Sequence, residues 1–180
     1  MYYGKMIPEM ELVTYPSNHL VMKNEKVEGW TRDVAERVGM MWKVMEQTDG
    51  IGLAAPQVGW NVRLFILGVP GPNDGDVVHR VVWNPEIHTS GDLVPMHEGC
   101  LSFPGIRADI PRWTRARLVG RTPEGPLDEV FVGLAAQAVQ HEMDHIDGLL
   151  FIEKMTPADR QRIAPILREL ADQKFPRGKK

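Results

Sequence analysis

The stretch QHEMDHIDG, residues 140–148, places the strongest constraint on how this chain can fold. His141 and His145 are four residues apart, and Glu142 directly follows the first histidine. On an α-helix each residue advances by about 100°, so side chains four apart lie on one face, one turn from each other. Two neutral imidazoles in this arrangement can bind one divalent metal ion, and the glutamate lies where it can take a proton from a water beside that ion. Two ligands leave a metal under-coordinated, so a fold that binds one at this helix must supply a further ligand from elsewhere.

Chance placement of two histidines on a helix is the competing interpretation of this short pattern. The flanking segments are apolar, with LAAQAV at 134–139 and LLF at 149–151. A polar His/Glu/His set inside an apolar helix costs free energy unless something pairs it. The surroundings therefore favour a metal site.

A third metal ligand is missing from the region after His145, which contains no further histidine. The carboxylates there are typical of solvated side chains. The single cysteine of the chain, Cys100, lies upstream in EGCLSFPG at 98–105. A thiolate is a strong ligand for zinc, iron, nickel or cobalt, although a free cysteine is most often a small buried residue. The residues by themselves leave both interpretations of Cys100 open.

The stretch GIGLAAPQVG at 50–59 is a run of small residues flanked by glycines, with the polar Gln57 near its end. It lacks the third glycine of the dinucleotide-binding pattern, and no strand-to-helix context follows it. A role in phosphate binding is therefore not expected.

Hydrophobic periodicity predicts helices and short strands that do not alternate strictly, so we expect an α+β fold. The first helix starts after Thr31 as N-cap and stops at Gly50. The last starts with TPAD and should kink or break at Pro165, because proline removes a backbone donor. The predicted helices span 31–49, 134–147 and about 157–173, and the predicted strands 62–69, 81–89, 114–122 and 128–133.

Composition excludes several classes of protein. The apolar fraction of 43% and charged fraction of 25% are ordinary for a soluble globular protein. No run of about 18 apolar residues predicts a membrane span, and no basic stripe with aromatics predicts a nucleic-acid partner. One cysteine permits no intramolecular disulfide, which suits a reducing compartment. We expect one catalytic domain over 1–180, with a solvated basic tail at 174–180 and no secretory signal at the start.

Together, the three stretches resemble the peptide deformylase family. GIGLAAPQ (50–57), EGCLS (98–102) and QHEMDH (140–145) match the family motifs GIGLAAxQ, EGCLS and QHExDH in full. The resemblance implies short antiparallel strands packed around a central helix that carries HExxH, plus a C-terminal helix. The implied reaction is removal of the formyl group from the N-terminal formylmethionine of newly made proteins.

The resemblance also implies a role for individual residues. Cys100, His141 and His145 would hold one divalent metal ion, ferrous iron by family preference, with Ni²⁺, Co²⁺ or Zn²⁺ able to substitute. Glu142 would act as general acid and base on a metal-bound water. The amide of Gln57 and the backbone N–H of Leu101 would donate to the charge that develops on the formyl oxygen.

The implied substrates are N-formylmethionyl peptides and nascent chains, and the peptide would pair as a strand with the cleft. Gln137 departs from the apolar residue of many relatives. Ribosome contact through the C-terminal region is a further implication, without a membrane or direct nucleic-acid role. The expected location is the cytoplasm of a bacterial-type cell, or an organelle if a targeting segment was removed. The implied cleft residues are Ile51, Gly52, Glu98, Gly99, Arg107, Leu134 and Ala138.

Three alternatives remain open at this point. The nearest is an HExxH metallopeptidase that cuts internal peptide bonds, which the missing downstream ligand disfavours. In the second, Cys100 is a nucleophile activated by a histidine, and HExxH then has no purpose. The third is a closed structural metal site, but such sites usually take four protein ligands. A chelator distinguishes the second alternative from the metal-dependent ones, because it would not inhibit an enzyme that uses Cys100 as a nucleophile.

Overall fold

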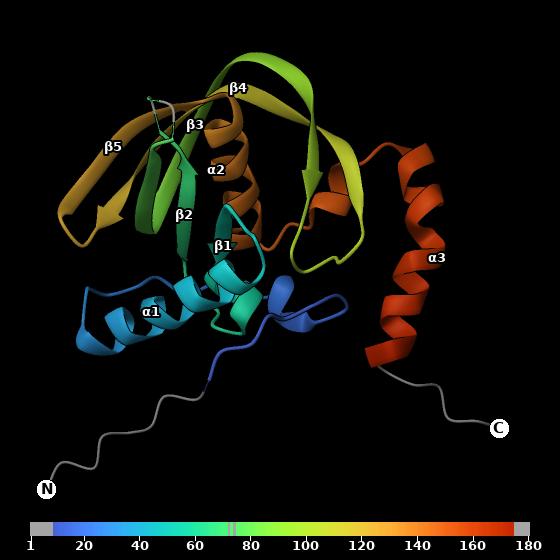
Figure 1. The fold of residues 1–180 in the computed structure, drawn as a ribbon, viewed down its shortest axis with the longest axis horizontal. Helices are drawn as coiled ribbons and strands as arrows, with labels where there is room; N and C mark the ends of the chain where they lie inside the picture. Colours follow the sequence, from blue (N-terminus) through green and yellow to red (C-terminus); the bar gives the residue numbers. More distant parts are fainter. Residues whose placement is uncertain (1–8, 72, 74, 175–180) are drawn as a thin grey trace, which may run out of the picture.

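A curled antiparallel sheet wraps around one helix in the computed structural model of the chain (Figure 1), which confirms the predicted α+β class. The structure describes residues 9–71, 73 and 75–174. Two expectations fall largely outside this range: the absence of a secretory signal, which concerns residues 1–8, and the solvated basic tail, of which 175–180 are not described. None of the described helices combines the length and the apolar content that a membrane crossing requires.

The sheet contains five strands in the order of the sequence, and each neighbouring pair is antiparallel. The strand at 64–70 confirms the prediction at 62–69. The strands at 107–122 and 125–132 begin earlier in the sequence than the predictions at 114–122 and 128–133. The strands are β1 (Gly52–Ala54), β2 (Leu64–Pro70), β3 (Val77–Gly99), β4 (Arg107–Thr122) and β5 (Gly125–Val132).

The strand predicted at 81–89 is too short, because β3 continues to Gly99. The polar HTSGD segment resembles a turn, but it forms an irregularity inside the strand. The pairing of β3 with β4 shifts register between Ser90 and Leu93, where Gly91 has a φ of 84°. Such bulges bend a strand without ending it. The bend curls the long β3–β4 pair and brings the end of β3, with Glu98 and Gly99, to the central helix.

The central helix, α2 (Gly133–Ile146), confirms the prediction at 134–147 and lies in the hollow of the curled sheet (Figure 1). Its Val139, Met143 and Ile146 belong to one buried cluster with side chains of β2, β4 and β5. Gly148, with a φ of 72°, ends the helix as expected, because the left-handed conformation suits glycine.

The first helix, α1 (Arg32–Gln47), packs its buried apolar side chains against β1 and β2. The Thr31 hydroxyl accepts from Val34 N–H at 3.3 Å, so the predicted N-cap is confirmed. The predicted stop at Gly50 is late. Asp49 takes the left-handed conformation, with a φ of 51°, which short polar side chains tolerate. Three short 3-10 helices complete the described chain: η1 (Asn18–Leu20), η2 (Ala55–Val58) and η3 (Phe151–Lys154).

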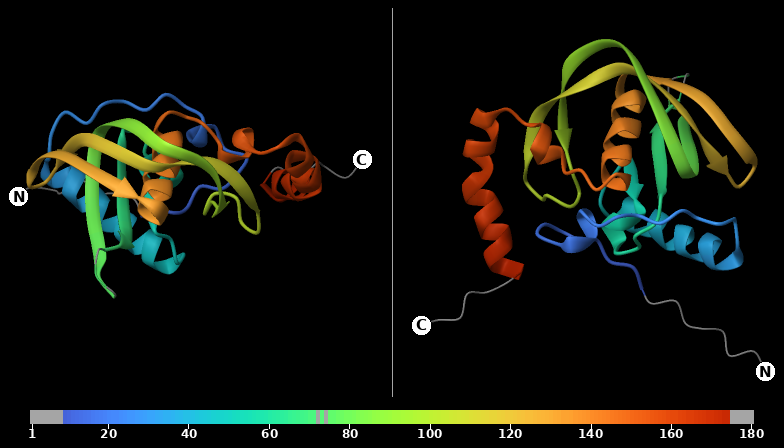
Figure 2. Two further views of the ribbon diagram at one scale, coloured as in Figure 1. Left: turned by 90° about the horizontal axis from the view of Figure 1, so that it is seen from above. Right: turned by 180° about the vertical axis from the view of Figure 1, so that it is seen from behind.

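The C-terminal helix, α3 (Pro157–Lys174), stands at one side of the molecule (Figure 2). The prediction was a kink or a break at Pro165; the helix runs through this residue without a break, and a kink there stays a prediction. Proline deprives the carbonyl of residue 161 of its helical donor, but Gln161 and Pro165 are both exposed, and water can replace that bond. Ile163, on the opposite face, is fully buried and holds the helix to the protein.

Replacing Pro165 by alanine should raise the stability of α3, because proline in a helix interior costs about 3 kcal/mol relative to alanine. We expect greater helical content in circular dichroism and a higher Tm than in the wild type. Arg168→Ala, at another exposed position of α3, is the control and should change stability by less than about 0.5 kcal/mol. Equal effects of the two substitutions would contradict this account.

Candidate active site

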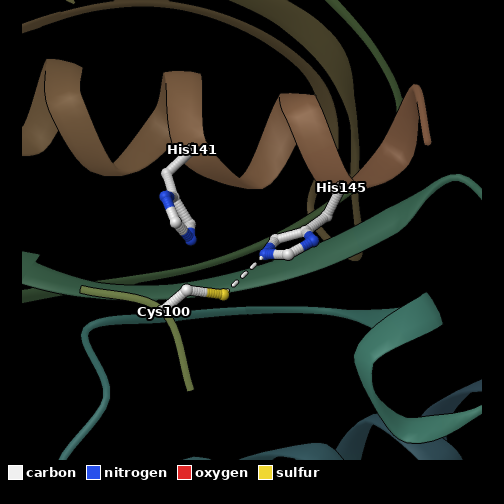
Figure 3. A group of neighbouring side chains, drawn as sticks. All are labelled: Cys100, His141 and His145. Carbon is white, nitrogen blue, oxygen red and sulfur yellow. Dashed lines mark hydrogen bonds between the residues drawn. The ribbon is translucent and has the colours of Figure 1, made fainter. Parts of the chain in front are cut away.

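Three potential metal ligands from distant parts of the sequence converge below α2 (Figure 3). Cys100 directly follows β3, and His141 and His145 project from one face of α2. Cys100 Sγ lies 3.2 Å from His145 Nε2, and one ligand atom from each of the three residues lies within 4.8 Å of the others. Bonds of about 2.0–2.3 Å to one ion put its ligand atoms about 3–4 Å apart. Within the described chain, this group alone has the composition and spacing of a metal site.

The ring of His141 is oriented by a carboxylate. Its Nδ1 lies 3.0 Å from Glu98 Oε2, which turns Nε2 toward Cys100 and His145. A carboxylate behind a histidine ligand is a recurrent feature of metal centres, because it fixes the tautomer and the direction of the ring. Glu98, which was predicted as a cleft residue, therefore also lies where it can orient the ring of His141.

Glu98 is held in turn by a buried arginine. Arg112 donates from Nε and Nη2 to the two carboxylate oxygens, at 2.6 and 2.9 Å, and from Nη1 to Asp144 at 2.7 Å. Lys154 reaches the other oxygen of Asp144 at 2.6 Å. Burial alone would raise the pKa of Glu98, but the hydrogen bonds from Arg112 and His141 outweigh it and lower that pKa to about 2. The network keeps a charged carboxylate behind His141.

Glu142 points an unpaired oxygen into the site. The side chain is 3% exposed, and its Oε2 is buried without a hydrogen-bond partner among the described residues. Burial raises the pKa of Glu142 to about 7. A cation bound beside it would lower that value again. An unpaired buried carboxylate is costly, so its presence points to a ligand or a reaction.

Gln57 faces the same site from η2. Its Oε1 accepts from Ala54 N–H at 2.9 Å, so the amide is oriented with Nε2 toward Ser102 Oγ, at 3.2 Å, and Cys100 Sγ, at 3.7 Å. The backbone N–H of Leu101 forms no hydrogen bond within the described residues. Two N–H donors therefore lie beside the cysteine: the unbonded Leu101 N–H, and the Gln57 amide, which now contacts Ser102 and Cys100.

A pocket of about 250 Å³ reaches this site and is lined there by Gln57, His141 and Glu142. One wall is the face of α2 formed by Leu134, Gln137, Ala138 and His141, and Glu142 also lines the pocket. The seven predicted cleft residues all line it, together with Gln57, Leu101 and three residues that the sequence did not single out: Asp49, Gly50 and His97.

Comparison with known proteins agrees with this geometry. The sequence model of the family "Polypeptide deformylase" matches residues 9–161. A peptide deformylase from Chlorobium luteolum is 38% identical over 160 residues, which cover 88% of this chain and 84% of that protein. The chain belongs to the polypeptide deformylase family. Family membership and the Cys100, His141 and His145 group together indicate a metal ion in this deformylase-family chain.

Solved structures support the family assignment. The crystal structure of Arabidopsis thaliana peptide deformylase 1B with an inhibitor superposes with a TM-score of 0.84 at 38% identity, covering 92% of this chain and 94% of that one. The curated Arabidopsis protein, "Peptide deformylase 1B, chloroplastic/mitochondrial", is 40% identical over 150 residues. The chain spans about half the length of this plant relative, 54%, and most of the bacterial one. Deformylases similar to this chain thus include bacterial and organellar proteins.

Some site residues of this family member had weak or no signal in the sequence. The sequence could not show whether Arg112 pairs with Asp144, and it gave no sign of the double contact of Arg112 with Glu98; the structure has both. The alternation of β4 could have shown it, because Arg112 occupies an inward position between the buried Ile110 and Ala116. Asn24, which bonds to the C-terminal end of α2, had no detectable signal in the sequence.

Proposed function

We propose that this chain is a metal-dependent deformylase, which hydrolyses the formamide bond of an N-formylmethionyl peptide. Water supplies oxygen to the formyl carbon, the carbon–nitrogen bond breaks, and formate and a free N-terminal amine result. The single observation that supports this most is the buried, unpaired Oε2 of Glu142, a residue that lines a pocket beside Cys100, His141 and His145.

The donor set fits a divalent ion that accepts thiolate and imidazole ligands. We infer ferrous iron, with nickel, cobalt or zinc able to substitute, from the family and from ligand softness. Three protein ligands leave room for a water, as in catalytic sites. An ion held there would supply a Lewis acid that lowers the pKa of an attached water. Metal analysis after purification without oxygen tests the identity, and a different resident metal would overturn it.

Glu142 is the proposed acid and base. Its carboxylate can take the proton from the attacking water and return it to the leaving nitrogen, so one buried group serves both transfers. Proton transfer works best when the pKa of the group lies near the working pH, and burial moves Glu142 in that direction.

Gln57 Nε2 and the Leu101 N–H are the proposed donors to the formyl oxygen. Both lie beside Cys100, and the Ala54 contact holds the Gln57 amide in one orientation. Fixed donors stabilise the transition state because they need no reorganisation when charge develops.

Gln57→Leu should therefore lower kcat by about 10²–10³ with little change in KM. Steady-state kinetics on a formyl-Met tripeptide gives both values, and the metal content should stay that of the wild type. Gln47→Leu, at the exposed end of α1, is the control. Unchanged turnover in Gln57→Leu would remove the glutamine from the mechanism.

The pocket beside Glu142 is the proposed binding place of the first side chain. Leu134, Ala138 and Ile51 give it apolar walls, which suit a methionine thioether. Gly52 and Gly99 leave backbone within reach of an extended peptide, and Arg107 lies on the substrate side. Gln137 donates to the His97 carbonyl at 3.2 Å, so this departure from the family adds one polar group to the wall. Comparing kcat/KM for different first residues tests the assignment, and no preference for methionine would contradict it.

Gly52→Ala should damage turnover without removing a catalytic group. A Cβ at residue 52 would lie 2.4 Å from Glu142 Oε1, so the carboxylate must move. A misplacement of about 1 Å can cost about 10²-fold in rate. Gly39→Ala, where a Cβ meets nothing within 4 Å, is the matched control and should keep wild-type kinetics. Equal kcat in both variants would show that the glycine is not required.

The experiment that tests the function is formate and amine release from a formyl-Met tripeptide, with and without a chelator. We expect chelator-sensitive formate release with every peptide bond intact. Cleavage of unformylated peptides would instead favour the metallopeptidase alternative. Formate release that survives complete metal removal would favour Cys100 as a nucleophile. A metal that stabilises the fold without any turnover would favour a closed structural site.

Partners and location follow from the same proposal. Nascent formylated chains are the proposed substrates, so the chain should act in a bacterial-type cytoplasm or in an organelle, which cell fractionation can test. Contact of the C-terminal region with the ribosome stays a prediction. Cosedimentation of the full chain with ribosomes should detect it, and its absence at low salt would contradict it.

A further inference from the structure

The C-terminal end of α2 is bound by a side chain from the N-terminal part of the chain. Asn24 is 5% exposed, and its Nδ2 donates to the carbonyls of His145, at 3.2 Å, and Ile146, at 2.9 Å. The two partners are 121 and 122 residues away in sequence. The last carbonyls of a helix lack partners within the helix, so donors from elsewhere can hold that end in place.

The segment before and after Asn24 fits closely around this helix end. Asn61 donates from Nδ2 to Asn24 Oδ1 at 3.1 Å, so both ends of the Asn24 amide are used and its orientation is fixed. Arg63 Nη1 lies 2.8 Å from Asp147 Oδ1, and a cation near a helix C-terminus interacts favourably with the helix dipole. At Gly148, a Cβ would lie 3.2 Å from the carbonyl oxygen of Val21.

The two histidines of the metal site are oriented by different means. Glu98 holds the ring of His141 through Nδ1. The Nδ1 of His145 is buried, and no protein group of the described chain bonds to it. Apart from the contact of Nε2 with Cys100 Sγ at 3.2 Å, the placement of the His145 ring therefore relies on the position of its own backbone. Asn24 holds the carbonyl of that same residue.

We propose that Asn24 is a positioning residue for the metal centre, which fixes His145 through the end of α2. Asn24 positions His145 by a hydrogen bond to its backbone carbonyl, whereas Glu98 positions His141 by a hydrogen bond to its ring. This inference rests on the three-residue metal site of the proposed function, but it does not depend on the substrate or on the reaction.

Asn24→Asp is the direct test. The isosteric carboxylate keeps the shape but presents oxygen to two carbonyl oxygens, so the end of α2 must shift. Partners behind a ligand usually change metal affinity by 10–100-fold, and we expect the dissociation constant for Co²⁺, measured by chelator competition, to rise at least about 10-fold. The absorption spectrum of the Co²⁺-loaded protein should also change, because the ligand geometry changes. Asn24→Ala removes the donors without adding a charge, and we expect at least about a 3-fold rise.

Asn84→Asp is the matched control. Asn84 Nδ2 donates to the Val27 carbonyl at 2.8 Å, and its Oδ1 accepts from Val27 N–H at 2.9 Å, so it fastens the same N-terminal segment to β3 without bonding to α2. It should lose unfolding stability in the metal-free protein but keep the Co²⁺ affinity and spectrum of the wild type.

Wild-type Co²⁺ affinity in both Asn24 variants would overturn the proposal, as would an equal loss of affinity in Asn84→Asp, which would show a purely structural role. If the wild-type protein itself fails to bind Co²⁺, the metal site of the proposed function fails instead.

Discussion

Glu142→Gln should abolish nearly all turnover while the protein keeps its metal. The amide has the shape of the carboxylate but cannot take a proton from water, and general acid–base catalysis contributes about 10²–10⁴-fold. Because Cys100, His141 and His145 are unchanged, we expect wild-type metal content with kcat lower by at least about 10²-fold. The measurements are formate release and metal analysis on the same sample.

Stability separates this effect from a damaged fold. Glu142 Oε2 is buried without a partner, so a neutral amide should cost no more free energy at this position than the charged carboxylate. The Tm of the metal-free variant should therefore equal or exceed that of the wild type. Glu46→Gln, at an exposed position of α1, is the control and should keep full activity. A fully metal-loaded Glu142→Gln protein with near-normal turnover would refute the proton-transfer role.

The metal-binding group could be predicted from the sequence because its signals are local. His141 and His145 are placed by helical spacing alone, and Cys100 was singled out as the only cysteine. The family motifs then joined the three, although 41 positions separate Cys100 from His141. The motif residues are thus found without any knowledge of the sheet that brings them together.

The residues that support this group were harder to predict because their signals are not local. Asn24 is one polar residue in a polar segment, and its target is a helix end 121 residues away. The extent of β3 was also hidden, since Ser90 and Gly91 resemble a turn when they are read without the partner strand β4. Pairing between distant strands decides whether such a segment bends or ends the strand.

Arg112 is the exception, since its inward position is visible in the alternation of inward and outward residues along β4. Arg112→Leu should destabilise the metal-free protein by about 3–5 kcal/mol, because breaking a buried ion pair leaves uncompensated charge. Here two carboxylates, Glu98 and Asp144, lose their shared partner. Arg117→Leu is the control on the same strand. Its bidentate pair with Asp128 is about half exposed, so its loss should cost less than about 1 kcal/mol.

The pH dependence of unfolding distinguishes charge from packing in Arg112→Leu. In the wild type the pKa of Glu98 is lowered to about 2, so its contribution to stability is present above its unfolded pKa, about 4.3, and is lost as the pH falls toward 2. In the variant, burial raises the pKa of Glu98, and protonation at low pH removes the unpaired charge. As the pH falls from 7, the variant should first regain stability as its Glu98 is protonated, and below about pH 4.3 the wild type should lose stability, so the difference in unfolding free energy between the two proteins should narrow steadily toward pH 2. A gap that stays constant from pH 7 to pH 3 would mean that Arg112 stabilises the site by filling space, and that the charge of Glu98 behind His141 has no part in its effect.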